Sequence, residues 1–186
     1  MTFVNDCKYA ILVDTSYLYR ASKQIEKEAR VDYSKLKAVI DDSEIQYSRL
    51  IAFVVDVNEL SDTDTDKEEL SRSFHGFAYS LEAMGYEVVL CKPRQEGSYR
   101  RTDCSVPIAV HAMQLAEKVD GLLIVSGVGD LYYIAETLRP RIRVDVMAFQ
   151  RMIDKNLKRS CSEMIELTES ILKDEDFAKK KIFATD

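Results

Sequence analysis

Short apolar runs alternate along the chain with segments whose apolar residues recur every three to four positions. The runs are bounded by polar residues and predict buried strands, whereas the three-to-four spacing predicts amphipathic helices. The predicted strands are 9–13, 50–55, 87–91, 121–126 and 141–149, with 164–167 as a candidate last strand. The predicted helices are 17–30, 33–42, 67–84, 105–119 and 131–138, with one further short helix after residue 149.

Strands that alternate with helices predict an α/β fold, with a mostly parallel sheet of about five strands covered by helices on both faces. In such three-layer sheets, ligands bind beyond the carboxyl ends of the strands. We expect one domain over residues 1–186, with a core at about 9–168 and a C-terminal helix or tail at 169–186. Polar segments at 60–66 and 92–103 predict loops.

The helix predicted at 105–119 has two distinctive features. Ser105 and Pro107 favour a helix start, as capping side chain and first-turn proline. Apolar residues cover much of the circumference of this helix, which predicts that it is packed on two sides.

The composition limits the class of protein and the cellular compartment that the sequence predicts. Hydrophobic residues make up 46% of the 186 residues, which is enough for a core, yet no run reaches the ~20 apolar residues of a membrane span. The four scattered cysteines include no CxxC pair, and no signal-peptide pattern opens the chain, which favours a reducing, cytoplasmic setting. The net charge of −6 means that nucleic-acid binding would need a local basic patch.

Two carboxylates fall just after apolar strands. Asp14 follows the first strand and Asp130 follows the strand at 121–126, so we expect both at the carboxyl edge of the sheet, within about 8 Å of each other. Carboxylate oxygens there would suit Mg²⁺ or Mn²⁺, and a bound metal can orient a water against a phosphodiester. The alternative is that both residues are helix caps, a position that aspartate favours.

Three segments together resemble a known family. Residues 11–19 are similar to the opening strand of the NYN domain, the PIN-like group of metal-dependent ribonucleases that includes the LabA-like proteins. Residues 108–120 resemble its central helix, and residues 123–131 resemble its Gly-rich acidic turn. With a weaker match of 163–168 to the final strand, the resemblance covers about 9–168 and implies a PIN-like fold and a metal-dependent endoribonuclease ancestry.

The departures from the family pattern lie at the site itself. Ser105 and His111 stand where the family places aspartates on the central helix, and Val128 replaces the first aspartate of the turn. Tyr17 replaces the asparagine after the first strand. Each lost carboxylate weakens the field that holds a hard dication, so any remaining site is expected to bind Mg²⁺ or Mn²⁺ weakly.

If the site is active, the resemblance assigns the metal to Asp14 and Asp130, with Asp103 or His111 assisting catalysis. Asp103 precedes the central helix, where it would either swing into the site or complement the helix dipole. His111 would act as a nitrogen ligand or general base, or simply as a satisfied histidine on an apolar helix.

A basic stretch before the central helix carries an aromatic residue. Arginine binds phosphates and an aromatic ring stacks bases, so this stretch would suit single-stranded RNA. The alternative is a solvated loop. The residues concerned are Lys92, Arg94, Tyr99, Arg100 and Arg101.

Two hypotheses follow. The first is a metal-dependent endoribonuclease with a reduced site, and the second is a catalytically inactive PIN-like module that binds RNA or a protein partner. A homodimer that completes or covers the site is a third alternative, with Tyr132 and Tyr133 as candidate interface residues. The sequence contains no P-loop, dinucleotide fingerprint or nucleophile elbow, which disfavours nucleotide-dependent enzymes and serine hydrolases.

Overall fold

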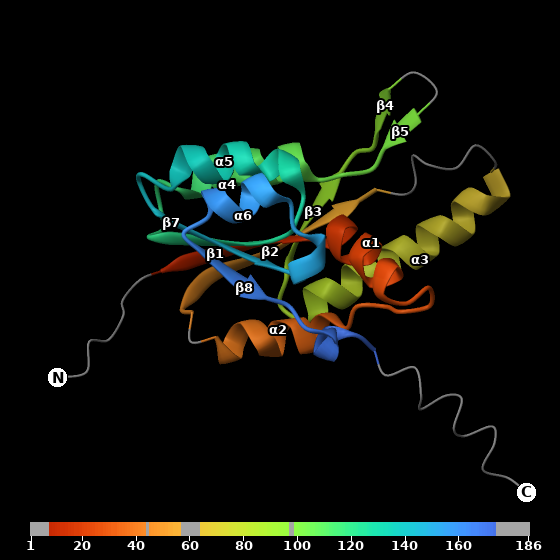
Figure 1. The fold of residues 1–186 in the computed structure, drawn as a ribbon. Coiled ribbons are helices and arrows are strands. Elements are labelled where there is room, and N and C mark those ends of the chain that lie inside the picture. The colour runs from red at the N-terminus through yellow and green to blue at the C-terminus, as the bar shows by residue number, and fades with distance from the viewer. Residues whose placement is uncertain (1–7, 44, 57–63, 97–98, 174–186) are drawn as a thin grey trace, which may run out of the picture.

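The computed structural model describes residues 8–43, 45–56, 64–96 and 99–173, and the side chains of 64–70 and 94–101 are left out of the description. Its centre is a six-stranded sheet in the order β3-β2-β1-β6-β7-β8, shown in Figure 1. The strands are β1 (Tyr9–Asp14), β2 (Tyr47–Val55), β3 (Glu87–Cys91), β6 (Gly121–Val125), β7 (Arg143–Ala148) and β8 (Glu163–Glu166).

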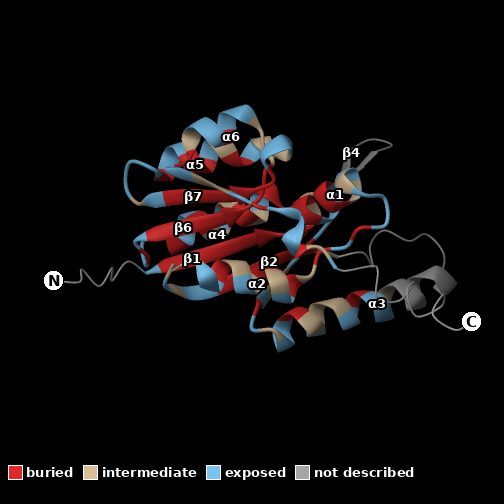
Figure 2. Cartoon of the chain, turned by 60° about the horizontal axis from the view of Figure 1, so that its bottom comes forward, coloured by how far each residue is buried: buried red, intermediate tan, exposed pale blue. Residues whose placement is uncertain are grey.

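All neighbouring strands in this sheet are parallel, which confirms the predicted fold class. Every residue of β1 and of β6 is buried, as expected of central strands covered on both faces. Figure 2 shows this buried centre and the more exposed outer elements. The sheet has six strands rather than about five, because the candidate last strand pairs with β7 as β8.

Helices cover both faces. Figure 1 shows α4 and α5 on one side of the sheet and α2 and α3 on the other. The helices are α1 (Thr15–Ile25), α2 (Tyr33–Asp42), α3 (Asp64–Ala83), α4 (Ser105–Leu115), α5 (Tyr132–Leu138) and α6 (Lys155–Ser160). Single 3-10 turns are η2 (Gly129–Leu131), η3 (Gln150–Met152) and η4 (Glu169–Ile171).

Two helices are shorter than predicted. Helix α1 ends at Ile25 instead of residue 30, because Ala29 and Val31 are drawn into the core and Val31 pairs with Leu172. Helix α4 ends at Leu115 instead of residue 119, and its last turn passes into a tight turn where Lys118 N donates to Leu115 O.

The two predicted loops differ from the structure in different ways. Residues 92–103 contain an antiparallel hairpin, β4 (Arg94–Glu96) with β5 (Tyr99–Arg101), because Arg94 pairs with Arg101 and Glu96 with Tyr99. Of the polar segment 60–66, residues 60–63 lie outside the described residues, and α3 already begins at Asp64.

Helix α4 packs against β1 and also against α5 and η2, while its outer face stays exposed. Ile108, Ala112 and Leu115 are buried against the core, whereas Val106 and Val110 are 51% and 49% exposed. The apolar residues of this helix extend beyond its packed faces, because the outer face is uncharged as well as the inner one. No helix within the described residues combines the length and apolar character that crossing a membrane requires.

Two glycines give a matched test of this backbone. Gly76 lies exposed inside α3 with nothing within 4 Å of an added Cβ, whereas Gly85, which follows the end of α3, has a φ of +91°. We expect Gly76→Ala to raise the free energy of unfolding by about 0.4–1 kcal/mol, since alanine favours the helix. Gly85→Ala should lower it by about 1 kcal/mol or more, because an L side chain disfavours that φ. Urea unfolding checks both, and shifts of the same sign would contradict the structure.

Candidate functional site

The carboxyl edge of the sheet is centred on β1 and β6. These strands are neighbours, with Val13 paired to Val125, and the chain continues from β1 into α1 and from β6 into the turn that leads to η2. Strand β2 lies on the other side of β1, so the connections diverge between β1 and β6. In open parallel sheets, this switch point is where ligands bind.

Asp14 lies at this point and is fully buried. Its Oδ1 accepts hydrogen bonds from Ser16 Oγ at 2.6 Å and Tyr17 N at 3.0 Å, which makes it the N-cap of α1. Its Oδ2 accepts one from Ser126 Oγ at 2.9 Å. Three of the roughly four lone pairs of the carboxylate are therefore used inside the protein.

Ser126 extends this connection into the turn after β6. Its hydroxyl donates to Asp14 and accepts from Val128 N at 3.2 Å. The carboxylate at the end of β1 thus holds both the start of α1 and the turn that follows β6.

Tyr17, in the position of the family's asparagine, is part of the same arrangement. Its hydroxyl accepts a hydrogen bond from Phe149 N at 3.0 Å, which ties α1 to the segment after β7. Burial raises the pKa of Tyr17 to about 12, opposed by the bond from Phe149 and assisted by the charge of Asp14.

Asp103 is close to the start of α4 and acts on its backbone. Its Oδ1 accepts from Ser105 N at 3.1 Å, a contact that complements the helix dipole. Ser105 is not the capping side chain that the sequence predicted, because Cys104 occupies the N-cap position and Ser105 is the first helical residue. The Ser105 Oγ is buried and has no hydrogen-bond partner.

Cys104 packs next to Cys91 at the end of β3, and both thiols are buried. The hydrogen bond with Cys91 and burial together raise the pKa of the Cys104 thiol. The hairpin β4–β5 thus lies between two buried cysteines, Cys91 at the end of β3 and Cys104 at the N-cap of α4.

His111 is half-buried on α4. Its Nδ1 lies 3.0 Å from Pro107 O, and because a carbonyl only accepts, Nδ1 carries the hydrogen. The ring meets Phe53 edge to face, with centroids 5.1 Å apart. These contacts are those of a satisfied histidine, and a role in catalysis stays a prediction.

Asp130 lies in η2 and is exposed, in contrast to Asp14. Both residues follow neighbouring strands at the same edge of the sheet, as the sequence predicted. The approach of their carboxylates to within about 8 Å stays a prediction.

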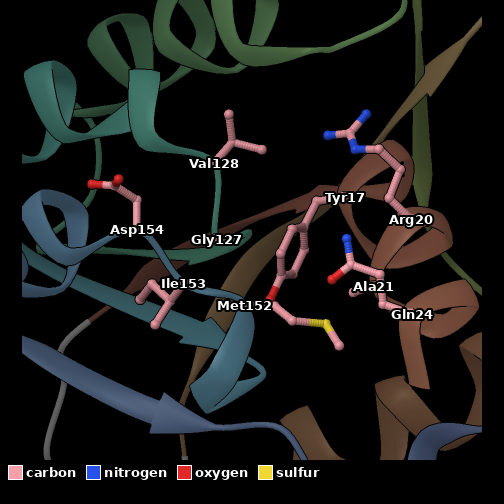
Figure 3. A pocket seen from close by; sticks show the side chains of 9 residues that line it. All are labelled: Tyr17, Arg20, Ala21, Gln24, Gly127, Val128, Met152, Ile153 and Asp154. Atoms are coloured by element: carbon pink, nitrogen blue, oxygen red, sulfur yellow. The ribbon is translucent and has the colours of Figure 1, made fainter.

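A pocket of about 350 Å³ opens at this edge between α1, the turn after β6 and the segment after β7. Figure 3 shows Arg20 and Gln24 on the α1 side and Asp154 across from them, with the ring of Tyr17 between. The lining residues are Tyr17, Arg20, Ala21, Gln24, Gly127, Val128, Met152, Ile153 and Asp154.

Gly127 allows the segment after β7 and the ring of Tyr17 to pack directly against the turn after β6. A Cβ at this position would lie 2.3 Å from Met152 O and 2.7 Å from Cε2 of Tyr17, so only glycine fits. Asp154 N also donates to Gly127 O at 3.0 Å.

The base of the hairpin lies close to α1, and the predicted RNA-binding residues come from this segment. Arg20 Nη1 donates to Thr102 O at 3.4 Å, just after β5. Lys92 is exposed, while Arg94, Tyr99, Arg100 and Arg101 have a described backbone in β4 and β5 and side chains that lie outside the description.

Sequence reasoning missed the polar residues of the pocket, namely Arg20, Gln24 and Asp154. A usable signal was present, because residues 17, 20, 21 and 24 follow the i, i+3, i+4, i+7 spacing of one helix face. Asp154 gave no such signal, since it comes to the site only through the return of the chain after β7.

The fold is that of a PIN-like nuclease-fold protein. The chain matches the model of the NYN domain over residues 8–169, and it belongs to the NYN domain family. A crystal structure of a protein of unknown function from Vibrio parahaemolyticus RIMD 2210633 is similar, with a TM-score of 0.72 and 23% identity. That match covers 93% of this chain and 100% of the other, and it shows a common fold. No curated protein matches the chain.

NYN and PIN-like nucleases are typically dependent on divalent metals. The donors present here fit such an ion poorly. Asp14 is buried and already accepts three hydrogen bonds, and Val128 offers no ligand atom. Within the part of the chain that the structure describes, no three His, Cys, Asp or Glu side chains come together to hold a metal.

Because Asp14 accepts hydrogen bonds from both α1 and the turn after β6, its substitution is expected to change stability even without a metal. We expect Asp14→Asn to lower the free energy of unfolding by about 1–3 kcal/mol in EDTA, because an amide cannot accept at both ends and loses the charge-assisted bonds. Urea unfolding measures this, with the exposed Glu117→Gln as a control that stays within about 0.5 kcal/mol. Unchanged or increased stability would indicate a carboxylate that is not needed to hold the fold.

The raised pKa of Tyr17 predicts sensitivity to alkali. The folded state prefers the neutral phenol, so its contribution is complete below the unfolded pKa of 10 and is lost as pH rises through about 12. We expect the free energy of unfolding to fall over pH 10–12, less steeply in Tyr17→Phe by up to about 1.4 kcal/mol per pH unit. Parallel pH profiles of the two proteins would contradict the assignment.

Proposed function

We propose that this protein binds single-stranded RNA at the carboxyl edge of its sheet and does not cleave it. The observation that carries the proposal is the state of Asp14. Its carboxylate, the first acidic position of the family's site, is fully buried and accepts three hydrogen bonds from the chain itself. A carboxylate bonded in this way stabilises the carboxyl edge of the sheet, where a ligand would bind. It has few lone pairs left to coordinate a metal.

The choice of RNA rests on the chemistry around that edge. Arg20 is exposed beside the hairpin, and the hairpin sequence contributes Arg94, Arg100 and Arg101 to the same region. Guanidinium groups bind phosphates in a forked geometry, so a basic segment of this kind compensates locally for the net charge of −6.

An exposed aromatic ring adds a surface for base stacking. Tyr19 on α1 is 63% exposed, and Lys23 Nζ lies 5.7 Å from the centroid of its ring. A ring beside a cation is a combination found in proteins that bind single-stranded nucleic acids, where bases stack on the ring and the cation neutralises phosphates.

Binding and cleavage are tested separately on labelled single-stranded RNAs. We expect binding in EDTA that weakens with salt, and a loss of roughly tenfold or more in Arg100→Glu/Arg101→Glu, because each lost phosphate contact lowers the affinity. Arg141→Ala, an exposed arginine just before β7 at the opposite edge, is the control and should bind as wild type does.

Cleavage is assayed with Mg²⁺ or Mn²⁺ in wild type and Asp130→Asn. Since Asp130 is exposed, this substitution tests the site with less risk to the fold than one at the buried Asp14. We expect intact RNA in both. Metal-dependent cleavage that disappears in Asp130→Asn would overturn the non-catalytic part of the proposal and support the metal-dependent ribonuclease instead. Absence of any RNA binding would overturn the whole and point to a protein partner.

A further inference from the structure

The outer surface of α5 and α6 is rich in basic residues, although the chain as a whole is acidic. Residues 139–159 contain seven basic and two acidic residues, whereas the net charge of the whole chain is −6. We propose that single-stranded RNA continues from the carboxyl edge onto this surface, with phosphates at the basic side chains and a base on the ring of Tyr133. This inference rests on the proposed RNA binding and extends it to a second surface.

The two acidic residues of this stretch are engaged within the protein. Asp145 is buried and forms an ion pair with Arg143. Asp154 is the N-cap of α6, and its side chain accepts hydrogen bonds from the first turn of that helix. Neither carboxylate therefore neutralises the exposed basic side chains of α6.

The exposed basic residues gather where α5 and α6 pack side by side (Figure 1). Arg139, which follows α5, donates from Nη1 to Arg159 O at 3.3 Å. Burial raises the pKa of the Cys161 thiol at the end of α6, and the charges of Arg139 and Lys158 oppose that rise, so both charges lie near the same end of the helix. Figure 2 shows that the outer side of α6 is exposed. The exposed basic residues of this surface are Arg139, Lys155, Lys158 and Arg159.

These four cations have no acidic partner among the residues that the structure describes, where the ion pairs lie elsewhere. Like charges that lie close together repel one another, so the cluster does not stabilise the folded chain. A polyanion is the ligand that compensates such a cluster. The phosphates of an RNA strand do so and release their counterions on binding.

Two aromatic rings border the basic surface at the start of α5. The ring centroids of Tyr132 and Tyr133 are 4.1 Å apart, and Tyr133 is 65% exposed. Tyr132 precedes Arg139 by seven residues, so the two residues lie on one face of the helix. An exposed ring beside cations allows a base to stack while its phosphate is neutralised, which favours a single strand over a duplex.

The surface begins at the carboxyl edge. Helix α5 follows η2 directly, and α6 packs against η2. A Cβ at Gly129 in η2 would lie 3.1 Å from Cγ of Asp154, so the turn after β6 and the start of α6 are in close contact. A strand that leaves the edge beside β6 therefore meets the first turns of both helices.

The first test is the salt dependence of binding of a labelled 12-mer RNA in EDTA. We expect the plot of log affinity against log salt concentration to be less steep by about 1.4 in Lys158→Gln/Arg159→Gln than in the wild type, because two phosphate contacts are lost. The matched control is Lys8→Gln/Lys118→Gln, which removes two exposed lysines that precede β1 and β6 at the amino edge. It removes the same charge from the chain and should leave the slope unchanged.

A second variant should strengthen binding, a result that unfolding cannot produce. Glu136 is exposed on α5, one turn after Tyr132. Glu136→Lys should raise the affinity and make the slope steeper by about 0.7, as one added phosphate contact predicts.

Stacking is tested apart from charge at Tyr133. Tyr133→Ala should weaken binding about fivefold or more with no change in the salt slope, because a stacked ring is lost and no cation is. Tyr133→Phe keeps the ring and should bind as wild type does.

The outcomes separate this inference from the proposed function. Equal slopes in the wild type and a folded Lys158→Gln/Arg159→Gln, with binding lost in Arg100→Glu/Arg101→Glu, would overturn the inference and leave the proposed function standing. A reduced slope in the α6 variant, with full binding in the hairpin variant, would support this surface and overturn the carboxyl edge as the site. Capture by phosphatidylserine vesicles that depends on Lys158 and Arg159, without RNA binding, would overturn both in favour of a membrane surface.

Discussion

The carboxylate of Asp14 is the interaction on which the carboxyl edge depends. A buried charge is tolerated only when it is hydrogen-bonded, and here three donors come from two places that are far apart in the chain. Tyr17 N and Ser16 Oγ belong to the start of α1, while Ser126 Oγ belongs to the turn after β6. One side chain therefore fixes the direction in which two segments leave the sheet.

In this arrangement, Asp14 stabilises the fold of the family through hydrogen bonds, which differs from the role of a carboxylate in a metal site. In a metal site, the same carboxylate would face solvent and a dication, and several neighbouring carboxylates would share the charge. By the resemblance to the family, Ser105, His111 and Val128 stand at the positions of those neighbours, and serine and valine carry no charge at neutral pH. The carboxylate of Asp14 is compensated by three hydrogen bonds from the chain itself.

Much of this architecture could be predicted from the sequence, because it rests on local patterns. The runs that became β1, β2, β3 and β6 are mostly apolar, and Asp14 stands where a strand passes into a helix. The pattern could not show that the outer face of α4 remains exposed, since an uncharged helix reads the same whether it is covered once or twice.

The site was less predictable than the sheet, for a physical reason. The second oxygen of Asp14 is used inside the protein only because of Ser126, which is 112 residues away in sequence and adjacent in space. The polar ends of the pocket are likewise brought together from α1 and from the start of α6 by the packing of the segments that carry them. Local periodicity contains no information about such contacts.

The hairpin β4–β5 follows Cys91 at the end of β3 and precedes Cys104 at the start of α4, and both cysteines are buried in the core. The core therefore fixes both ends of this segment, and lengthening a loop between fixed ends costs little free energy. Residues 92–103 can therefore change in length and composition with little effect on the sheet. A protein engineer can use this position to graft a foreign recognition loop.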